Sequence, residues 1–159
     1  MRVYLPATVP LLRDWLAADA ATVTGTAYAV TPSLREWYRE GDAEELEHAA
    51  SSLAAGVALK LLAADSDAAP RRVVLAVEVD DADCAPDPDE RGAVRLRGPV
   101  PKAAWASALV DDVTADFAVV EAVKLLRDPG AAVDDVDFAR GQAEAVELGW
   151  HAVQELRFL

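Results

Sequence analysis

The sequence predicts a single α+β domain over residues 1–159, in which a mixed sheet of four or five strands packs against about five helices. Helical and strand patterns mix along the chain without the strict alternation of a parallel α/β fold. The chain has 159 residues, the length of one ordinary domain, and 53% of them are hydrophobic. It contains neither an internal repeat nor a linker long enough to divide it.

The chain begins with the pattern of a strand followed by a helix. Residues 2–5 form a short apolar strand that ends at Pro6. Residues 9–18 then place three large apolar side chains at helical spacing, namely Val9, Leu12 and Leu16.

A second strand and a second helix follow. Residues 25–31 are rich in β-branched and aromatic side chains, which favour a strand. Pro32 suits the first turn of a helix that Thr31 caps. This helix is expected over residues 33–40 and ends at Gly41.

A long helix is predicted over residues 42–64. Asp42 and Glu45 have the spacing of a capping box. The apolar stripe that follows has a 3.6-residue period and consists of Leu46, Ala50, Leu53, Val57 and Leu61. Because Leu59 and Leu62 lie on the opposite side, this helix is either sandwiched within the fold or exposes a second apolar face to a partner.

The second half of the chain begins with three expected strands. Residues 71–79 are apolar on both faces and predict a central strand. Residues 80–90 are dense in Asp and Pro and predict an exposed loop, in which Cys84 is exposed as well. Residues 93–97 alternate as in an edge or half-buried strand, and residues 105–110 form another strand.

Two helices are expected to complete the fold. The first is capped by Asp112 or Thr114 and runs to Leu126, before a turn that contains Pro and Gly. The second covers residues 136–157.

Charge and cysteine content exclude several classes of function. The 28 acidic and 15 basic residues give a net charge of −13, which disfavours nucleic acid and anionic membrane surfaces as partners. A lone cysteine cannot form an internal disulfide or a multi-thiolate zinc site. Without a signal-peptide core or an apolar run of membrane-spanning length, the protein is expected in the cytoplasm.

Common catalytic motifs are absent from the sequence. It contains no Gly-x-Gly-x-x-Gly, Walker loop, Gly-x-Ser-x-Gly, His-Glu-x-x-His or Cys-x-x-Cys. No cofactor is therefore predicted, and the balance favours a protein that is not an enzyme.

A group of aromatic and arginine residues is the first candidate site. Tyr28, Arg35, Trp37 and Tyr38 could hold a small anionic ligand or anchor a protein partner, because an arginine beside aromatic rings suits both tasks. The favoured alternative is that Trp37 packs under the sheet while Arg35 pairs with a nearby acid. The other three tryptophans are also expected in the core, and they are Trp15, Trp105 and Trp150.

A divalent metal site is the second candidate. Glu45 and His48 have the Glu-x-x-His spacing of carboxylate-bridged metal sites. On the expected last helix, Glu144, Glu147 and His151 share one face. The favoured alternative is that both sets are solvated helix faces, because each lies opposite an apolar stripe.

Several segments of the sequence, taken in order, resemble those of a protein family. They are MRVYLPAT, VTPSLREWYREGDAEELEHAA, RRVVLAVEV, RGPVP, VDDVDFA and ELGWHAVQEL. Together they resemble, nearly end to end, a family of small uncharacterised actinobacterial proteins with a domain of unknown function. The resemblance implies a bacterial cytoplasmic single-domain protein and carries no activity, cofactor or site residue.

These observations lead to three functional hypotheses. The first is a non-enzymatic binding module that self-associates or docks on another protein, and two-fold dimers are the commonest soluble assemblies. The alternative is a metal-binding protein or metal-dependent enzyme that uses Glu45, His48, Glu144, Glu147 and His151. The third is a small-molecule enzyme built around Tyr28, Arg35 and Tyr38.

Overall fold

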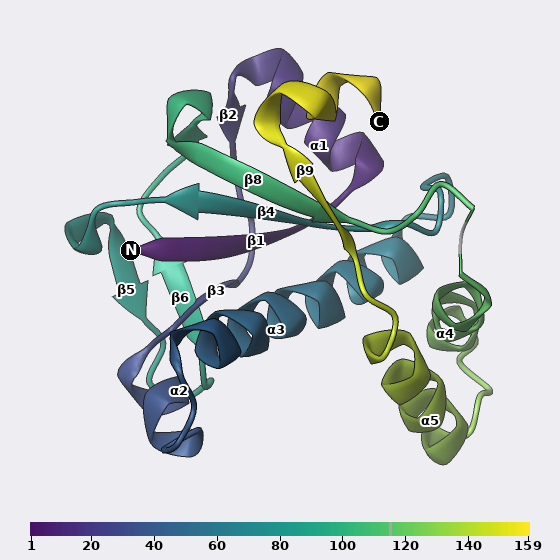
Figure 1. Cartoon of the computed structure of the whole chain (residues 1–159). Coiled ribbons are helices and arrows are strands. Elements are labelled where there is room, and N and C mark those ends of the chain that lie inside the picture. The colour runs from purple at the N-terminus through teal and green to yellow at the C-terminus, as the bar shows by residue number, and fades with distance from the viewer. Residues whose placement is uncertain (115) are drawn as a thin grey trace.

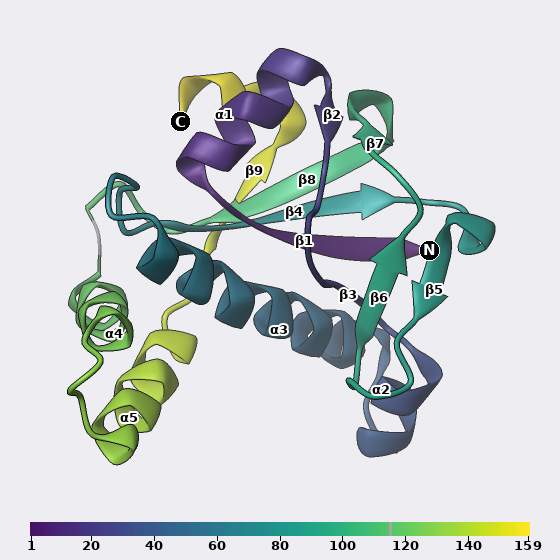
Figure 2. The same ribbon diagram turned by 180° about the vertical axis from the view of Figure 1, so that it is seen from behind.

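The computed structural model describes residues 1–114 and 116–159, and this part of the chain forms a seven-stranded sheet with helices on both faces (Figures 1 and 2). The order of the strands is β5-β6-β3-β1-β4-β8-β9, and every neighbouring pair is antiparallel. Their bounds are β1 Arg2–Thr8, β3 Ala27–Ala29, β4 Arg72–Glu78, β5 Cys84–Pro86, β6 Ala93–Leu96, β8 Trp105–Val110 and β9 Gly149–Ala152.

Short elements and five α-helices complete the structure. A two-stranded sheet joins β2 (Ala20–Ala21) to β7 (Val100–Pro101). The helices are α1 Val9–Ala18, α2 Pro32–Trp37, α3 Ala43–Ala64, α4 Phe117–Arg127 and α5 Val133–Glu144. The 3-10 helices are η1 Asp81–Asp83, η2 Lys102–Ala104 and η3 Val153–Phe158. Of the helices described, none is long and apolar enough to cross a membrane.

The α+β class is confirmed, but the expected sheet is wrong in size and in type. It has seven strands rather than four or five, and it is antiparallel rather than mixed. The missed strands are short, and a run of two to four residues shows no clear alternation of its own. Pairing with a neighbouring strand, which the sequence does not display, decides their conformation.

Alternate residues of the central strands supply two separate cores. Val3 and Leu5 of β1 pack with α1, including Leu12 and Trp15. Tyr4, the residue between them, packs on the other side of the sheet with α3. Figures 1 and 2 show α1 and η3 over one face of the sheet and α3 over the other.

The central position of β4 is confirmed, because β4 lies between β1 and β8 and is buried over most of its length. The expected end of the first strand at Pro6 is wrong, since β1 continues to Thr8 and Pro6 lies opposite Val74 of β4. On its other side, β1 pairs with β3 only at Val3 and Tyr4. Pro6 lies beyond that pairing, where a strand can lack an N–H without losing a ladder hydrogen bond.

The expected start of the long helix is confirmed. The backbone N–H of Glu45 donates to Oδ1 of Asp42 at 2.9 Å, and the N–H of Asp42 donates to Oε2 of Glu45 at 3.2 Å. Helix α3 is also sandwiched within the fold. Its Leu46 contacts the sheet, whereas Leu59 and Leu62 contact α4 and α5.

The acidic segment 80–90 is not simply an exposed loop. It contains η1 and β5, and β5 pairs with β6, so β6 is an inner strand and not an edge. The exposure expected for Cys84 is wrong, because its side chain is buried and its Sγ lies 3.6 Å from Sδ of Met1. Strand pairing turns this side chain toward the α1 core despite its acidic neighbours.

The expected start of the fourth helix is also corrected. Neither Asp112 nor Thr114 caps α4, because Asp112 accepts hydrogen bonds from the N–H and hydroxyl of Thr114 in a local turn. Asp116 is the cap, and it accepts from the N–H of Ala118 at 2.8 Å. Ala115, which the expected helix included, lies outside the described residues.

The expected helix over residues 136–157 is wrong, because α5 ends at Glu144 and the chain continues into β9 and η3. A buried arginine explains the break. Arg72 of β4 donates from Nη1 to the carbonyl of Ala143 and from Nη2 to that of Val146, both at 2.9 Å. These bonds hold the end of α5 against the sheet, so the chain can turn and pair with β8.

Asp111 completes this buried cluster, which we call the Arg72 clamp (Arg72, Asp111 and the carbonyls of Ala143 and Val146). Nε and Nη2 of Arg72 donate to the two carboxylate oxygens of Asp111, each at 2.8 Å. Both side chains are 2% exposed. The charges are paired and every bond is short, which is the condition under which a buried ion pair is tolerated.

Candidate functional site

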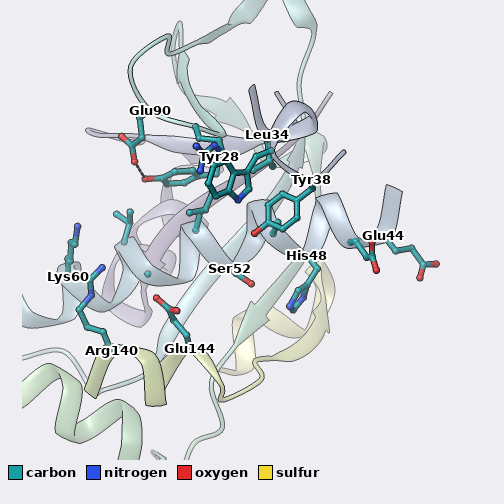
Figure 3. Close-up of a pocket in the computed structure, with 17 residues that line it drawn as sticks. Tyr28, Leu34, Tyr38, Glu44, His48, Ser52, Lys60, Glu90, Arg140 and Glu144 are labelled. Atoms are coloured by element: carbon teal, nitrogen blue, oxygen red, sulfur yellow. Dashed lines mark hydrogen bonds between the residues drawn. The ribbon is translucent and has the colours of Figure 1, made fainter. Parts of the chain in front are cut away.

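A groove of about 920 Å³ runs along the outward side of α3 (Figure 3). We call it the α3 groove. The floor is made by α3 residues, including Ser52, Leu53 and Val57. One wall comes from α2 and the β5–β6 turn, and the other comes from α5.

The apolar part of the α3 groove is built around an exposed tryptophan. Trp37, the last residue of α2, is 63% exposed, and Tyr38 beside it is 44% exposed. The guanidinium of Arg91 lies 3.7 Å from the centre of the Trp37 ring, a distance typical of a cation–π contact. Leu53, 39% exposed, extends the apolar surface onto the floor.

A hydrogen bond between strand and turn fixes the wall that carries Arg91. The hydroxyl of Tyr28, on β3, donates to Oε1 of Glu90 at 2.5 Å (Figure 3). Burial of the Tyr28 ring raises the pKa of its hydroxyl, and the bond to Glu90 raises it further. Tyr28 therefore stays a neutral donor, which suits a structural support better than a proton-transfer group.

The residue after Arg91 is a glycine that the turn requires. Gly92 has φ +76°, a conformation that residues with a side chain rarely adopt. A Cβ at this position would also lie 3.0 Å from Cδ1 of Leu53. Gly92 thus lets the wall approach the floor closely and directs the chain into β6.

The two ends of the α3 groove carry opposite charges. Glu44 and Glu45 lie at the N-terminal end of α3, and Lys60 lies near its C-terminal end. Arg140 of α5 lies at the Lys60 end, away from Glu44 (Figure 3). Lys60 lies sixteen positions after Glu44 on α3. At a rise of about 1.5 Å per residue, the groove follows the helix for about 24 Å.

Three of the four residues expected to bind a ligand line the same groove. They are Tyr28, Trp37 and Tyr38, whereas Arg35 is exposed on α2 and does not line it. The core position favoured for Trp37 is wrong, because α2 is only six residues long and buries Leu34 instead. The groove is also lined by Arg91, Lys60 and Arg140, which were not predicted because they come from other segments and carry no local motif.

The other tryptophans divide between core and surface. Trp15 and Trp105 are buried, as expected. Trp150 is 65% exposed, and its expected burial is wrong because it lies on the edge strand β9 and not on a helix.

The residues of the metal hypothesis are only partly brought together. Glu45, His48 and Glu144 line the α3 groove, and His48, Glu144 and Glu147 line a second cavity of about 490 Å³. His151 lines neither, and its Nδ1 lies 4.0 Å from Oε2 of Glu155. The helical face expected to join Glu144 to His151 does not exist, because α5 ends at Glu144. In residues 1–114 and 116–159, no three His, Cys, Asp or Glu side chains are grouped so that they could hold a metal ion.

Comparison with known proteins gives a family and no activity. The chain matches, over residues 1–159, the model of a family described as "Family of unknown function (DUF6912)". No curated protein and no solved structure matches it. The family match agrees with the resemblance to an uncharacterised family that the sequence suggested.

Proposed function

Because the chain belongs to this family of unknown function, we propose its function from the α3 groove: the protein is a binding module that holds a segment of a partner protein against α3. The observation that carries the proposal is Trp37, a large aromatic side chain left 63% exposed and stacked with Arg91 at the edge of the groove. Tryptophan, tyrosine and arginine dominate the binding energy of protein interfaces.

The dimensions of the groove favour a chain segment over a small ligand. A groove of about 24 Å matches about seven residues of extended chain, at roughly 3.3 Å per residue. Its volume of about 920 Å³ lies at the upper end of small-molecule pockets. The polar residues that line it are spread along this length instead of converging on one point, as they would around a small substrate.

The surface offered to a partner is held in place before binding. Helix α3 packs on the sheet through Leu46 and Ala50, and on α4 and α5 through Leu59. The Tyr28–Glu90 hydrogen bond holds the opposite wall. A preformed surface of this kind loses little conformational entropy when a segment binds.

Two variants test the proposal, each with a matched control. Trp37→Ala removes the aromatic anchor, and Trp150→Ala removes an equally exposed tryptophan outside the groove. Gly56→Leu fills the floor, because a Cβ at Gly56 meets no atom within 4 Å and points into open space. Ala17→Leu introduces the same side chain at an exposed position of α1, on the other face of the sheet.

The measurement is selection from a displayed library of random peptides of about twelve residues, followed by fluorescence anisotropy with the enriched peptides. We expect Trp37→Ala and Gly56→Leu each to weaken binding at least about tenfold, while both controls bind like the original protein. Circular dichroism confirms that each variant is folded. Peptides that bind all four variants equally, or a library from which nothing is enriched, would contradict the proposal.

A further inference from the structure

The α3 groove is lined by charged residues of both signs. Glu44 lies at one end, whereas Lys60 and Arg140 lie at the other, where Glu144 of α5 lies beside Arg140 (Figure 3). The basic end is built from two elements, because Lys60 belongs to α3 and Arg140 to α5. Interaction with the dipole of a single helix therefore does not account for it.

The two basic side chains at this end, Lys60 and Arg140, form few ion pairs within the protein. Across the described part of the chain, no carboxylate lies within 4.0 Å of Lys60, and the nearest ion pair of Arg140 is with Asp137 at 4.0 Å. Glu90 and Glu144 line the same groove, but neither forms an ion pair with Lys60 or Arg140 within 4.0 Å among the described residues. A carboxylate supplied by a partner would find this end of the groove available.

The acidic residues of the groove differ in the hydrogen bonds that they accept from the protein. Glu90 accepts the hydroxyl of Tyr28, and Glu45 accepts the backbone N–H of Asp42 in the capping box. Glu44 has no such hydrogen bond among the described residues, and it is exposed. The N-terminal end of the groove thus presents one carboxylate that a cation can reach.

Between the charged ends lies the apolar strip of Trp37, Leu53 and Val57. We infer that the segment bound in the α3 groove is bipolar: a cationic side chain pairs with Glu44, an apolar middle covers Trp37 and Leu53, and an anionic side chain pairs with Lys60 and Arg140. This inference rests on the proposed function and adds the chemistry of the partner. Complementary charges at both ends fix the register of the segment as well as its affinity.

Distant charges do not prevent such recognition. The net charge of −13 repels anionic partners as a whole, but at physiological ionic strength the screening length is about 8 Å. A carboxylate at this end of the groove therefore responds mainly to the charges nearby, which are Lys60, Arg140 and Glu144, and not to acids on the remote faces.

The test is a pair of double-mutant cycles between the protein and an enriched peptide. In the first, Lys60→Glu is combined with a change of the acidic residue of the peptide to Lys. In the second, Glu44→Lys is combined with a change of the basic residue of the peptide to Glu. Lys124→Glu, an exposed charge reversal on α4 outside the groove, is the control.

We expect each single reversal to weaken binding about five- to tenfold and each matched double reversal to restore most of the loss. Two crossed combinations should not restore binding: Lys60→Glu with the peptide whose basic residue is changed, and Glu44→Lys with the peptide whose acidic residue is changed. The control variant Lys124→Glu should bind normally. Failure to enrich any peptide that depends on Trp37 overturns the proposed function and this inference together. Enrichment of Trp37-dependent peptides that are neutral, or that show no restoration, overturns this inference alone.

Discussion

The guanidinium of Arg72 makes four side-chain hydrogen bonds, two to Asp111 and two to backbone carbonyls at the end of α5. Removal of this side chain leaves a carboxylate without a counter-ion at a site that is 2% exposed. Breaking a buried pair in this way costs more than the pair itself contributes, because one charge stays in a poorly solvated environment.

We therefore expect Arg72→Met to lower the free energy of unfolding by about 3–5 kcal/mol. Arg2→Met breaks the exposed pair of Arg2 with Glu78 and should cost at most about 1 kcal/mol. Urea denaturation followed by circular dichroism measures both. A loss below about 1 kcal/mol for Arg72→Met would show that the clamp does not hold the fold.

Two tyrosines should ionise late in the folded protein. Burial raises the pKa of Tyr28 and of Tyr4, with further contributions from Glu90 and Glu47 respectively. The folded state thus keeps protons that the unfolded state releases near pH 10, so stability is fully present below that pH and falls as the pH rises above it.

The fraction of ionised tyrosine is measured by absorbance at about 295 nm and roughly pH 10.5. We expect less tyrosinate in the folded protein than in urea, and a smaller difference after Tyr28→Phe. Equal tyrosinate in both states, with the circular dichroism of the fold intact, would contradict the assignment.

Elements with a continuous pattern and a local cap were predictable from the sequence. The capping box of Asp42 and Glu45 and the apolar period behind it specify α3, and residues 72–78 are apolar on both faces, which specifies β4 as a central strand. The end of α5 was not predictable, because its apolar period continues through Val146, Trp150 and Val153. The clamp and the pairing of β9 with β8 override that period, and both depend on residues far away in the chain.

Some residues of the candidate site could be predicted from the sequence and others could not. Tyr28, Trp37 and Tyr38 lie close together in the sequence, so their aromatic grouping could be noticed. Lys60, Arg91 and Arg140 belong to three separate segments, and only the packing of α5 and the β5–β6 turn beside α3 brings them to one groove.

Two glycines, Gly56 in the α3 groove and Gly92 beside it, should respond oppositely to substitution by alanine. A Cβ at Gly56, inside α3, meets no atom within 4 Å, so Gly56→Ala should stabilise by about 0.5–1 kcal/mol and raise Tm by about 1–4 °C. Gly92→Ala should destabilise, because φ is +76° and Leu53 lies 3.0 Å from the added Cβ. Differential scanning calorimetry measures both, and a lower Tm for Gly56→Ala would show that α3 is not free at this position.

Helix α3 connects two of the three clusters of buried hydrophobic residues found in the described part of the chain. Its first half packs on the sheet with Tyr4 and Tyr28, and its second half packs on α4 and α5. The α3 groove therefore lies on a helix that is held along its length. Figure 1 shows α2 near one end of this helix and α5 near the other. A partner that fills the groove would contact α2, the β5–β6 turn and α5 at once.

The Arg72 clamp also has a consequence for the order in which the chain is made. Arg72 leaves the ribosome before any of the four oxygens that accept its side-chain hydrogen bonds has been made, since they belong to residues 111, 143 and 146. Until those residues emerge, the guanidinium at the start of β4 has none of its native acceptors and stays in contact with water. We therefore expect this end of β4 to become buried only after α5 and the residues that follow it have been made.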